Sequence, residues 1–188
     1  PRTPSKSLPF KLWPKQQEFL HWLVGLEAQQ VNGLCEKSRG VGISFLCCAY
    51  ALHGWLFKPG WKCGFGSRKL EYVDELGNPD SLFEKVRFML RRLPDWMAPQ
   101  GFKWREHDNR SRLLNPTTGA ILNGEGGDQI GRGGRCSIYF VDEAAFLERP
   151  HLAEASLVET TNVRIDVSTP NGPGNPFATK RYSLLPER

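Results

Sequence analysis

The sequence predicts an α/β domain in which helices cover both faces of a mainly parallel central sheet. Runs typical of strands alternate with segments typical of helices along the chain, as expected for a parallel sheet. Residues 137–141 (SIYFV) are continuously apolar, which is typical of a strand buried on both faces. Residues 44–57 (SFLCCAYALHGWLF) are apolar almost all round, which indicates a buried helix. The chain has 188 residues, enough for one domain of this kind.

The composition is that of an ordinary soluble globular protein, with 39% hydrophobic and 24% charged residues. A net charge of +5 is compatible with nucleic-acid binding but also occurs in proteins that never bind it. No signal peptide or run long enough to cross a bilayer is visible, so we expect no membrane partner. Five cysteines without metal-site spacing are expected to be reduced, mostly buried thiols of a cytosolic protein: Cys35, Cys47, Cys48, Cys63 and Cys136.

The N-terminal elements come first in the prediction. Residues 1–9 (PRTPSKSLP) lack acids and are rich in proline and serine, which is typical of an arm or linker. A helix is expected over 15–30, after a proline, and a short buried strand over 31–35. A glycine loop then leads into the buried helix at 44–57. Strand, glycine loop and helix in this order are the context in which phosphate-binding loops occur.

The remaining elements continue the alternation. Asp80 is expected to cap a helix whose apolar stripe runs from Leu82 to Leu90. A turn at 116–118 predicts a hairpin between its flanking segments. In chain order we expect a strand at 61–67, helices at 68–76 and 80–92, hairpin strands at 111–114 and 119–123, a glycine-rich loop at 124–135, the strand at 137–141, a helix near 148–160 and a strand near 163–168.

Residues 35–44 (CEKSRGVGIS) approximate the phosphate-loop pattern G-x-x-x-x-G-K-[ST]. Alignment on Gly42 and Ser44 puts Ile43 at the usual lysine position and Lys37 at the position of the first glycine. The glycines allow backbone N–H groups to point at a phosphate, and Ser44 offers a hydroxyl to Mg²⁺. The missing cation is expected to come from the front of the loop, from Lys37 or from Arg39.

A second motif follows the apolar strand, which ends in two adjacent acids, Asp142 and Glu143. At the end of a buried strand an aspartate can hold a hydrated Mg²⁺. A neighbouring carboxylate can polarise a water molecule for attack on a γ-phosphate. Together with the loop upstream, the acid pair predicts a site for ATP and Mg²⁺.

Three segments in order, EKSRGVGIS, IYFVDEAAF and STPNGPGNPF, resemble the ATPase domain of the large terminase subunit of tailed bacteriophages. That family often has a loop of the form K-x-R-x-x-G-x-S, which this chain matches at Lys37, Arg39, Gly42 and Ser44. The resemblance covers about residues 10–178. It implies a RecA-like (ASCE) P-loop NTPase fold for residues 10–188. It also implies nucleotide binding by the loop residues Lys37, Ser38, Arg39, Gly40, Val41, Gly42, Ile43 and Ser44.

The resemblance also implies roles outside these two motifs. An early glutamine reads the adenine in this family, and here Gln16 or the adjacent Gln17 takes that position. Trp13 could help to wall the base, but a tryptophan before a proline lies more often in the core, and we expect it there. A segment rich in serine and threonine couples hydrolysis to movement, and its matching residues are Ser168, Thr169 and Asn171. A neighbouring subunit supplies an arginine finger, for which we favour Arg132, between glycines, over Arg135.

These implications describe an ATP-hydrolysing, Mg²⁺-dependent motor domain that moves double-stranded viral DNA into a procapsid. Lys37 binds the triphosphate, Ser44 and Asp142 hold Mg²⁺, and Glu143 orients the attacking water. Expected partners are double-stranded DNA, the portal protein, the small terminase subunit and further copies in a ring, a pentamer on the portal, with a monomer as the alternative state in isolation. Expected localisation is the host cytoplasm, with transient docking on the procapsid. The C-terminal nuclease of this family has no counterpart after residue 178, so we expect no nuclease activity.

Two other functions remain open at this point. The first is another nucleic-acid-dependent P-loop ATPase, such as a helicase. The sequence D-E-A-A after the strand differs from the D-E-x-[HD] of helicases, and 188 residues cannot hold two RecA-like domains. The second is a non-catalytic nucleic-acid-binding module with a degenerate loop. Ile43 favours this reading and Glu143 opposes it.

Overall fold

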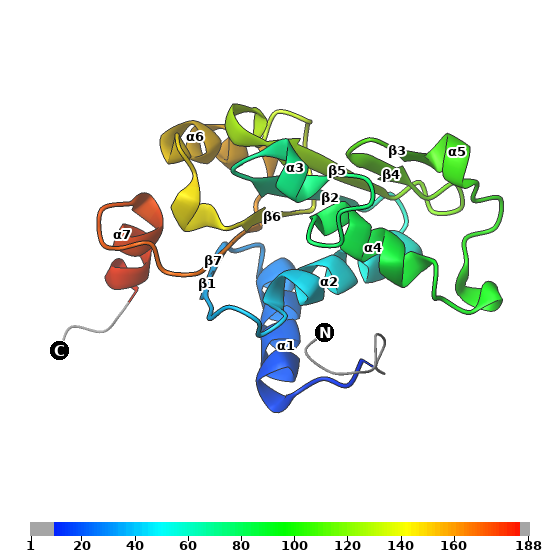
Figure 1. Ribbon diagram of the computed structural model, residues 1–188, viewed down its shortest axis with the longest axis horizontal. Coiled ribbons are helices and arrows are strands. Elements are labelled where there is room, and N and C mark those ends of the chain that lie inside the picture. Colours follow the sequence, from blue (N-terminus) through cyan, green and yellow to red (C-terminus); the bar gives the residue numbers. More distant parts are fainter. Residues whose placement is uncertain (1–9, 185–188) are drawn as a thin grey trace.

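The computed structural model describes residues 10–184, and these contain a seven-stranded sheet in the order β1-β7-β6-β2-β5-β4-β3 (Figure 1). The first five strands in this order are parallel, and β4 and β3 continue the sheet in antiparallel fashion. The strands are β1 (Gly33–Glu36), β2 (Lys62–Ser67), β3 (Asp108–Asn109), β4 (Arg112–Leu114), β5 (Ile121–Gly126), β6 (Ile138–Asp142) and β7 (Arg164–Ser168). The mainly parallel sheet confirms the predicted class.

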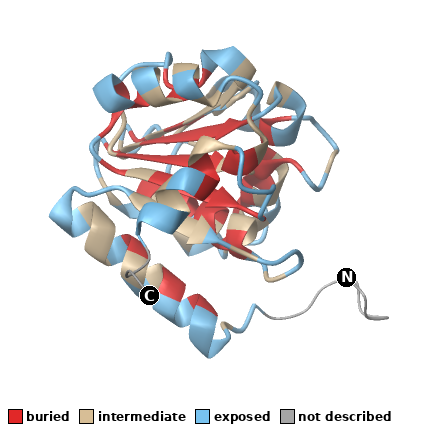
Figure 2. Cartoon of the chain, turned by 90° about the vertical axis from the view of Figure 1, so that its left-hand side faces the viewer, coloured by how far each residue is buried: buried red, intermediate tan, exposed pale blue. Residues whose placement is uncertain are grey.

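Helices cover both faces of this sheet (Figure 2). The helices are α1 (Pro14–Gln29), α2 (Ile43–Phe57), α3 (Leu70–Val73), α4 (Leu82–Leu90), α5 (Trp104–His107), α6 (Pro150–Thr160) and α7 (Pro176–Ser183). The residues of β6 alternate between two hydrophobic clusters. Ile138 and Phe140 pack into the larger cluster with α1, α2 and α4, whereas Tyr139 and Val141 pack with α6 and α7. This double burial explains why the strand reads as a continuous apolar run.

The parallel strands bring three motifs to one edge of the sheet. In the register of β1 against β7, Glu36 faces Ser168, and in that of β6 against β7, Asp142 faces Val167. The segments that follow these strands therefore begin side by side. The glycine loop, the acid pair and residues 168–171, called here the coupling segment after their predicted role, meet at this carboxyl edge, where open α/β sheets bind their ligands.

Several predicted boundaries differ from the structure. The helix expected at 68–76 is the single turn α3, and the chain then turns through Gly77, which has a φ of 81° that favours glycine. Asp80 does not occupy the cap of the next helix, which begins at Leu82. Ser81 precedes it, and the Ser81 hydroxyl donates to the carbonyls of Glu75 and Asn78. The glycine-rich loop begins later than expected, because β5 continues to Gly126.

Helix α7 is not anticipated by the sequence analysis. Its N-cap is Asn175, whose side-chain oxygen accepts a hydrogen bond from the Ala178 N–H at 3.0 Å. Pro176 follows at the first helical position, where its missing N–H costs nothing. A cap followed by proline is a recognised start signal, but the preceding run of glycine and proline residues obscures it.

All five cysteines lie in the described residues and are free thiols, with Cys47, Cys48 and Cys63 fully buried. Burial raises the pKa of both Cys35 and Cys136 to about 11, so these thiols are protonated near neutral pH. The predicted arm at 1–9 lies outside the described residues. No helix within residues 10–184 has the length and apolar character that a membrane span requires.

Candidate active site

The glycine loop connects β1 to the first turn of α2. Gly40 and Gly42 have φ values of 78° and 79°, in the left-handed region that residues with a side chain rarely adopt. In the described part of the chain, no side chain caps the N-terminus of α2. Its first N–H groups are therefore available to an anion, and the helix dipole favours negative charge there. The loop has the backbone features that phosphate binding requires.

Lys37 is the cation inside this site. Its Nζ lies 2.7 Å from Glu143 Oε1, and its side chain is only 9% exposed. The backbone N–H of Lys37 donates to the carbonyl of Ser168 at 3.0 Å, which fixes the front of the loop against β7. Arg39, the other candidate cation, is exposed. Lys37 therefore lies at the junction of the loop, the acid pair and the coupling segment.

Ser44 and Asp142 form the second contact between the loop and the acid pair. The Ser44 hydroxyl donates to Asp142 Oδ1 at 2.9 Å across 98 residues of sequence. Burial raises the pKa of Asp142 above its ordinary value, although Lys37 and the Ser44 hydrogen bond oppose this shift. A hydroxyl and a carboxylate side by side suit Mg²⁺, which takes oxygen ligands and keeps several of its waters. Within residues 10–184 no group of three or more His, Cys, Asp and Glu side chains is placed to hold a metal ion.

Glu143 adopts a left-handed backbone conformation with a φ of 53°, one of three such non-glycine residues in the described chain. Strain of this kind persists where surrounding contacts hold it, often at functional sites. Oε2 of Glu143 accepts hydrogen bonds from the Thr169 N–H at 3.4 Å and the Thr169 hydroxyl at 3.2 Å. Burial raises the pKa of Glu143, but hydrogen bonds from Lys37 and Thr169 outweigh it and hold the pKa below its ordinary value.

Ser168 and Asn171 hold the turn that follows Glu143. The Ser168 hydroxyl accepts from the Ala145 N–H at 3.1 Å and lies 3.3 Å from Glu143 Oε2. The Asn171 side chain donates to the Ala145 carbonyl at 3.0 Å. These hydrogen bonds connect the end of β7 and the segment after it to the turn at Glu143.

Gln16 contacts the phosphate loop through its side chain. Its Nε2 donates to the Val41 carbonyl at 3.0 Å, and its Oε1 accepts from the Trp13 N–H at 3.0 Å. Gln16 is buried and Gln17 is exposed. The expectation that Trp13 lies in the core is wrong, because its side chain is 60% exposed and α1 turns only its later apolar residues inward.

The two arginine-finger candidates lie in the segment that runs from the end of β5 back to the start of β6. Arg132 and Arg135 are both exposed. Arg135 immediately precedes Cys136, whose N–H donates to Thr160, and this contact lies at the opposite end of β6 from Asp142. Of the two arginines, Arg132 is farther in sequence from the start of β6. A role for Arg132 in a neighbouring subunit stays a prediction.

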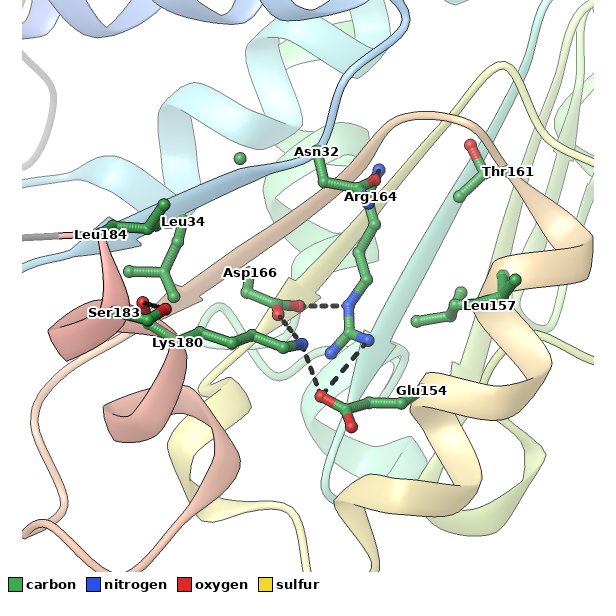
Figure 3. A pocket seen from close by; sticks show the side chains of 12 residues that line it. Asn32, Leu34, Glu154, Leu157, Thr161, Arg164, Asp166, Lys180, Ser183 and Leu184 are labelled. Carbon is green, nitrogen blue, oxygen red and sulfur yellow. Dashed lines mark hydrogen bonds and ion pairs between the residues drawn. The ribbon is translucent and has the colours of Figure 1, made fainter.

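A separate cavity of about 460 Å³ lies between α6 and α7, over β1 and β7 (Figure 3). Two basic and two acidic side chains meet in it. Arg164 lies 2.6 Å from Asp166, and Lys180 lies 2.5 Å from Glu154 and 3.3 Å from Asp166. These charges compensate one another within the protein. The cavity is therefore a less suitable phosphate site than the glycine loop.

The sequence pattern does not predict that Lys37 pairs directly with Glu143. It also does not predict that the Ala145 backbone binds Ser168 and Asn171. The available signal is topological. Segments that follow parallel strands start at one edge of the sheet, so charged residues there are expected to meet. Which charged residues meet there depends on the backbone turn at Glu143.

Comparison with known proteins gives the fold an independent reference. No family model and no curated protein sequence matches this chain. Among solved structures, the large terminase of a thermophilic bacteriophage matches with a TM-score of 0.66 at 14% identity, over 94% of this chain and 43% of that protein. The same terminase in complex with ADP matches with a TM-score of 0.61 at 15% identity, over 93% of this chain and 43% of that one.

The large terminase ATPase domain of a Thermus phage matches with a TM-score of 0.52 at 18% identity, over 86% of this chain and 72% of that one. This chain is thus an α/β domain with the fold of large terminase ATPase domains. The resemblance seen in the sequence is confirmed at the level of the fold. The chain spans less than half the length of the first two terminase structures.

Proposed function

We propose that this chain is the Mg²⁺-dependent ATPase domain of a motor that translocates double-stranded viral DNA into a procapsid. The observation that carries the proposal is the contact between Lys37 and Glu143, at 2.7 Å and 106 residues apart. It joins the glycine loop to the acid pair and supports a role of both in phosphoryl transfer. The terminase fold, and the ADP complex of one such terminase, support the same reading.

The loop N–H groups and Lys37 bind the triphosphate. A lysine ammonium has three donors, so Lys37 can hold Glu143 and a phosphate oxygen at the same time. Ser44 and Asp142 would hold Mg²⁺, which neutralises charge on the phosphate oxygens when it is bound. No other described residue pair places a hydroxyl beside a carboxylate at the start of α2.

Glu143 orients the attacking water and accepts its proton. Its lowered pKa keeps the carboxylate ionised at neutral pH, as this role demands. One of its oxygens faces Lys37, and the other is held by Thr169. Departure of the γ-phosphate changes the charge next to Lys37 and Glu143. Thr169, Ser168 and Asn171 carry that change into the segment after β7.

The motor itself requires partners beyond this chain. We propose double-stranded DNA, the portal protein, the small terminase subunit and a ring of copies, with Arg132 reaching the site of a neighbour. Within a ring, its guanidinium stabilises charge on the departing phosphate. The same assignment places the working protein in the host cytoplasm, docked on the procapsid during packaging.

Replacement of Glu143 by glutamine tests the catalytic assignment. The amide keeps the shape of the side chain but cannot accept the proton, so ATP binding persists and hydrolysis falls by about 100-fold or more. The measurement is ATP turnover at rising protein concentration with double-stranded DNA, beside ATP-analogue binding by calorimetry. Glu148→Gln, at a nearby exposed glutamate, is the matched control and is expected to retain full turnover.

The same assay, repeated with single-stranded DNA, separates the rival functions. A non-catalytic binding module predicts that the wild-type chain binds nucleic acid without turnover at any concentration. A helicase-like ATPase predicts turnover that single-stranded DNA stimulates more than double-stranded DNA. Normal turnover by Glu143→Gln would show that another residue activates the water.

A further inference from the structure

The glycine-rich segment that carries Arg132 is held at the preceding residue, Gly131, by two side chains. The Gly131 N–H donates to Glu125 Oε2 at 2.6 Å, and the Gly131 carbonyl accepts from the Thr160 hydroxyl at 2.5 Å. Glu125 lies near the end of β5 and Thr160 at the end of α6, so the segment is tied to two different elements. We call Glu125 and Thr160 the loop clamp.

The Glu125 carboxylate is itself held in place by Tyr139 on β6. The Tyr139 hydroxyl donates to the same Oε2 atom at 2.6 Å. The Tyr139 side chain is buried against Gly64 and Gly66 of β2, where a Cβ would come within 2.1 Å and 3.0 Å of its ring. Hydrogen bonds to an ionised carboxylate are among the stronger ones in proteins. The carboxylate is therefore fixed relative to the sheet.

The glycines on either side of Arg132 fit this arrangement. A Cβ at Gly131, whose φ is 82°, would lie 2.9 Å from the Cβ of Ser156 on α6. A Cβ at Gly133 would lie 2.5 Å from Glu125 Oε1. Both distances are shorter than the roughly 3.5 Å at which non-bonded heavy atoms pack. The backbone is thus closely packed on both sides of Arg132.

The Arg132 side chain is exposed and makes no hydrogen bond or ion pair within residues 10–184. Exposure alone does not explain this, because the exposed Arg149 pairs with Asp128 of the same segment at 2.9 Å. A guanidinium without a partner, on a backbone that is already fixed, can bind another molecule without the entropic cost of ordering its loop. The segment is therefore suited to presenting Arg132 outside its own chain.

We propose that Glu125 is a positioning residue, which fixes the segment from which Arg132 reaches the active site of a neighbouring copy. The inference rests on the proposed function, in which Arg132 stabilises charge on the departing phosphate. Placement matters because a shift of about 1 Å in a catalytic group can lower a rate about 100-fold. Within residues 10–184 the hydrogen bonds of the Glu125 side chain go to Gly131 and Tyr139. Loss of Glu125 should therefore leave nucleotide binding by its own subunit intact.

ATP turnover with double-stranded DNA, measured beside ADP binding by calorimetry, tests this role. Glu125→Ala is expected to lower kcat about 10- to 100-fold with ADP affinity unchanged. Glu125→Ala combined with Arg132→Ala should be no slower than Arg132→Ala alone, because Glu125 acts through Arg132. Glu125→Gln, whose amide oxygen can still accept from Gly131, should restore most of the turnover. Gln129→Ala, at an exposed position of the same segment, is the matched control and should retain full turnover.

Mixed copies show in which subunit Glu125 acts. Glu143→Gln copies lack turnover of their own but keep the loop clamp and Arg132. An excess of them should therefore restore turnover to Glu125→Ala copies by supplying the arginine from a neighbour. Tyr139→Phe is the milder variant, because it keeps the buried ring and removes only the hydroxyl that holds Glu125. It decides the test if Glu125→Ala does not fold, and its kcat should fall about threefold with ADP affinity unchanged.

Four outcomes would overturn the positioning role. Turnover by Glu125→Ala at the wild-type rate would overturn it, as would additive losses in the double variant or no rescue by Glu143→Gln copies. Turnover by Arg132→Ala at the wild-type rate would remove the group that Glu125 is proposed to position. In each of these cases wild-type turnover leaves the ATPase assignment standing. A wild-type chain without turnover at any concentration would overturn the proposed function together with the role of Glu125.

Discussion

Two clusters of buried charge, at different ends of the sheet, differ in how many of their N–H donors already have a hydrogen-bond partner. Arg87 on α4 donates from all five of its N–H groups, to Asp74, Asp108 and Glu84, at 2.6–3.1 Å. Lys37 has three donors, and within residues 10–184 its one side-chain hydrogen bond goes to Glu143. The saturated cluster has no donor to offer a ligand, and the second cluster has two.

Both clusters contain a non-glycine residue in a left-handed conformation, Ser111 beside Asp74 and Glu143 beside Lys37. Arg87 and Asp74 are 4% and 3% exposed, and the cluster ties α3, α4 and β3 together. Burial alone would lower the pKa of Arg87, but its bonds to Asp74 and Asp108 raise it, so the guanidinium stays charged. The Lys37 cluster lies on loops with left-handed residues at Gly40, Gly42 and Glu143. Buried charge alone therefore does not identify a site. The feature that differs between the two clusters is the number of donors left without a partner in the described chain.

The largest expected effect of a substitution outside the site falls on stability. Arg87→Met leaves three carboxylates with little exposure and no cation between them, so the free energy of unfolding should fall by about 3–5 kcal/mol. Chemical denaturation measures this loss, and nucleotide binding by the folded fraction should remain. Arg91→Met, at the exposed C-cap of the same helix, should change stability by at most about 0.5 kcal/mol. If Arg87→Met matched that control, the saturated cluster would not be structural.

A smaller effect distinguishes the two acids of the site by pH. The folded pKa of Glu143 lies below its unfolded value of 4.5, so its stabilising effect is present above that value and is lost as the pH falls through the folded pKa. The folded pKa of Asp142 lies above its unfolded value of 3.8, so ionised Asp142 destabilises the fold at neutral pH, and protonation relieves this as the pH falls.

Thermal midpoints of two variants between pH 3 and 7 test these signs. Glu143→Gln should lower the midpoint at neutral pH, and Asp142→Asn should raise it, each by on the order of 2 °C. Both differences should shrink in acid, because the wild-type groups then become neutral. Shifts of the same sign at neutral pH would mean that the two carboxylates share one environment.

The sequence alone predicts the sheet, the loop and the position of the acid pair, because each depends on a local sequence pattern. The apolar run of β6 and the all-round apolar α2 indicate a buried parallel sheet, and both are present. The meeting of Ser44 and Asp142 also follows, since parallel strands end at the same edge.

Other features depend on contacts that no local pattern carries. The left-handed turn at Glu143 is unexpected for a residue with a side chain, and it directs the carboxylate toward both Lys37 and Thr169. The helix expected at 68–76 stops at Val73, because Asp74 is held by Arg87 and Gly77 then turns the chain. The exposure of Trp13 depends on how α1 docks.

We propose that the cation of this phosphate loop is Lys37, at the front of the loop and not at the position of Ile43. Binding of a non-hydrolysable ATP analogue with Mg²⁺ to Lys37→Met and Arg39→Met tests it directly. Loss of the ammonium from a charge-assisted hydrogen bond should weaken binding about 10- to 100-fold in Lys37→Met. Arg39→Met should remain within about threefold of wild type. The opposite ranking, with Arg39→Met impaired and Lys37→Met close to wild type, would show that Arg39 supplies the cation.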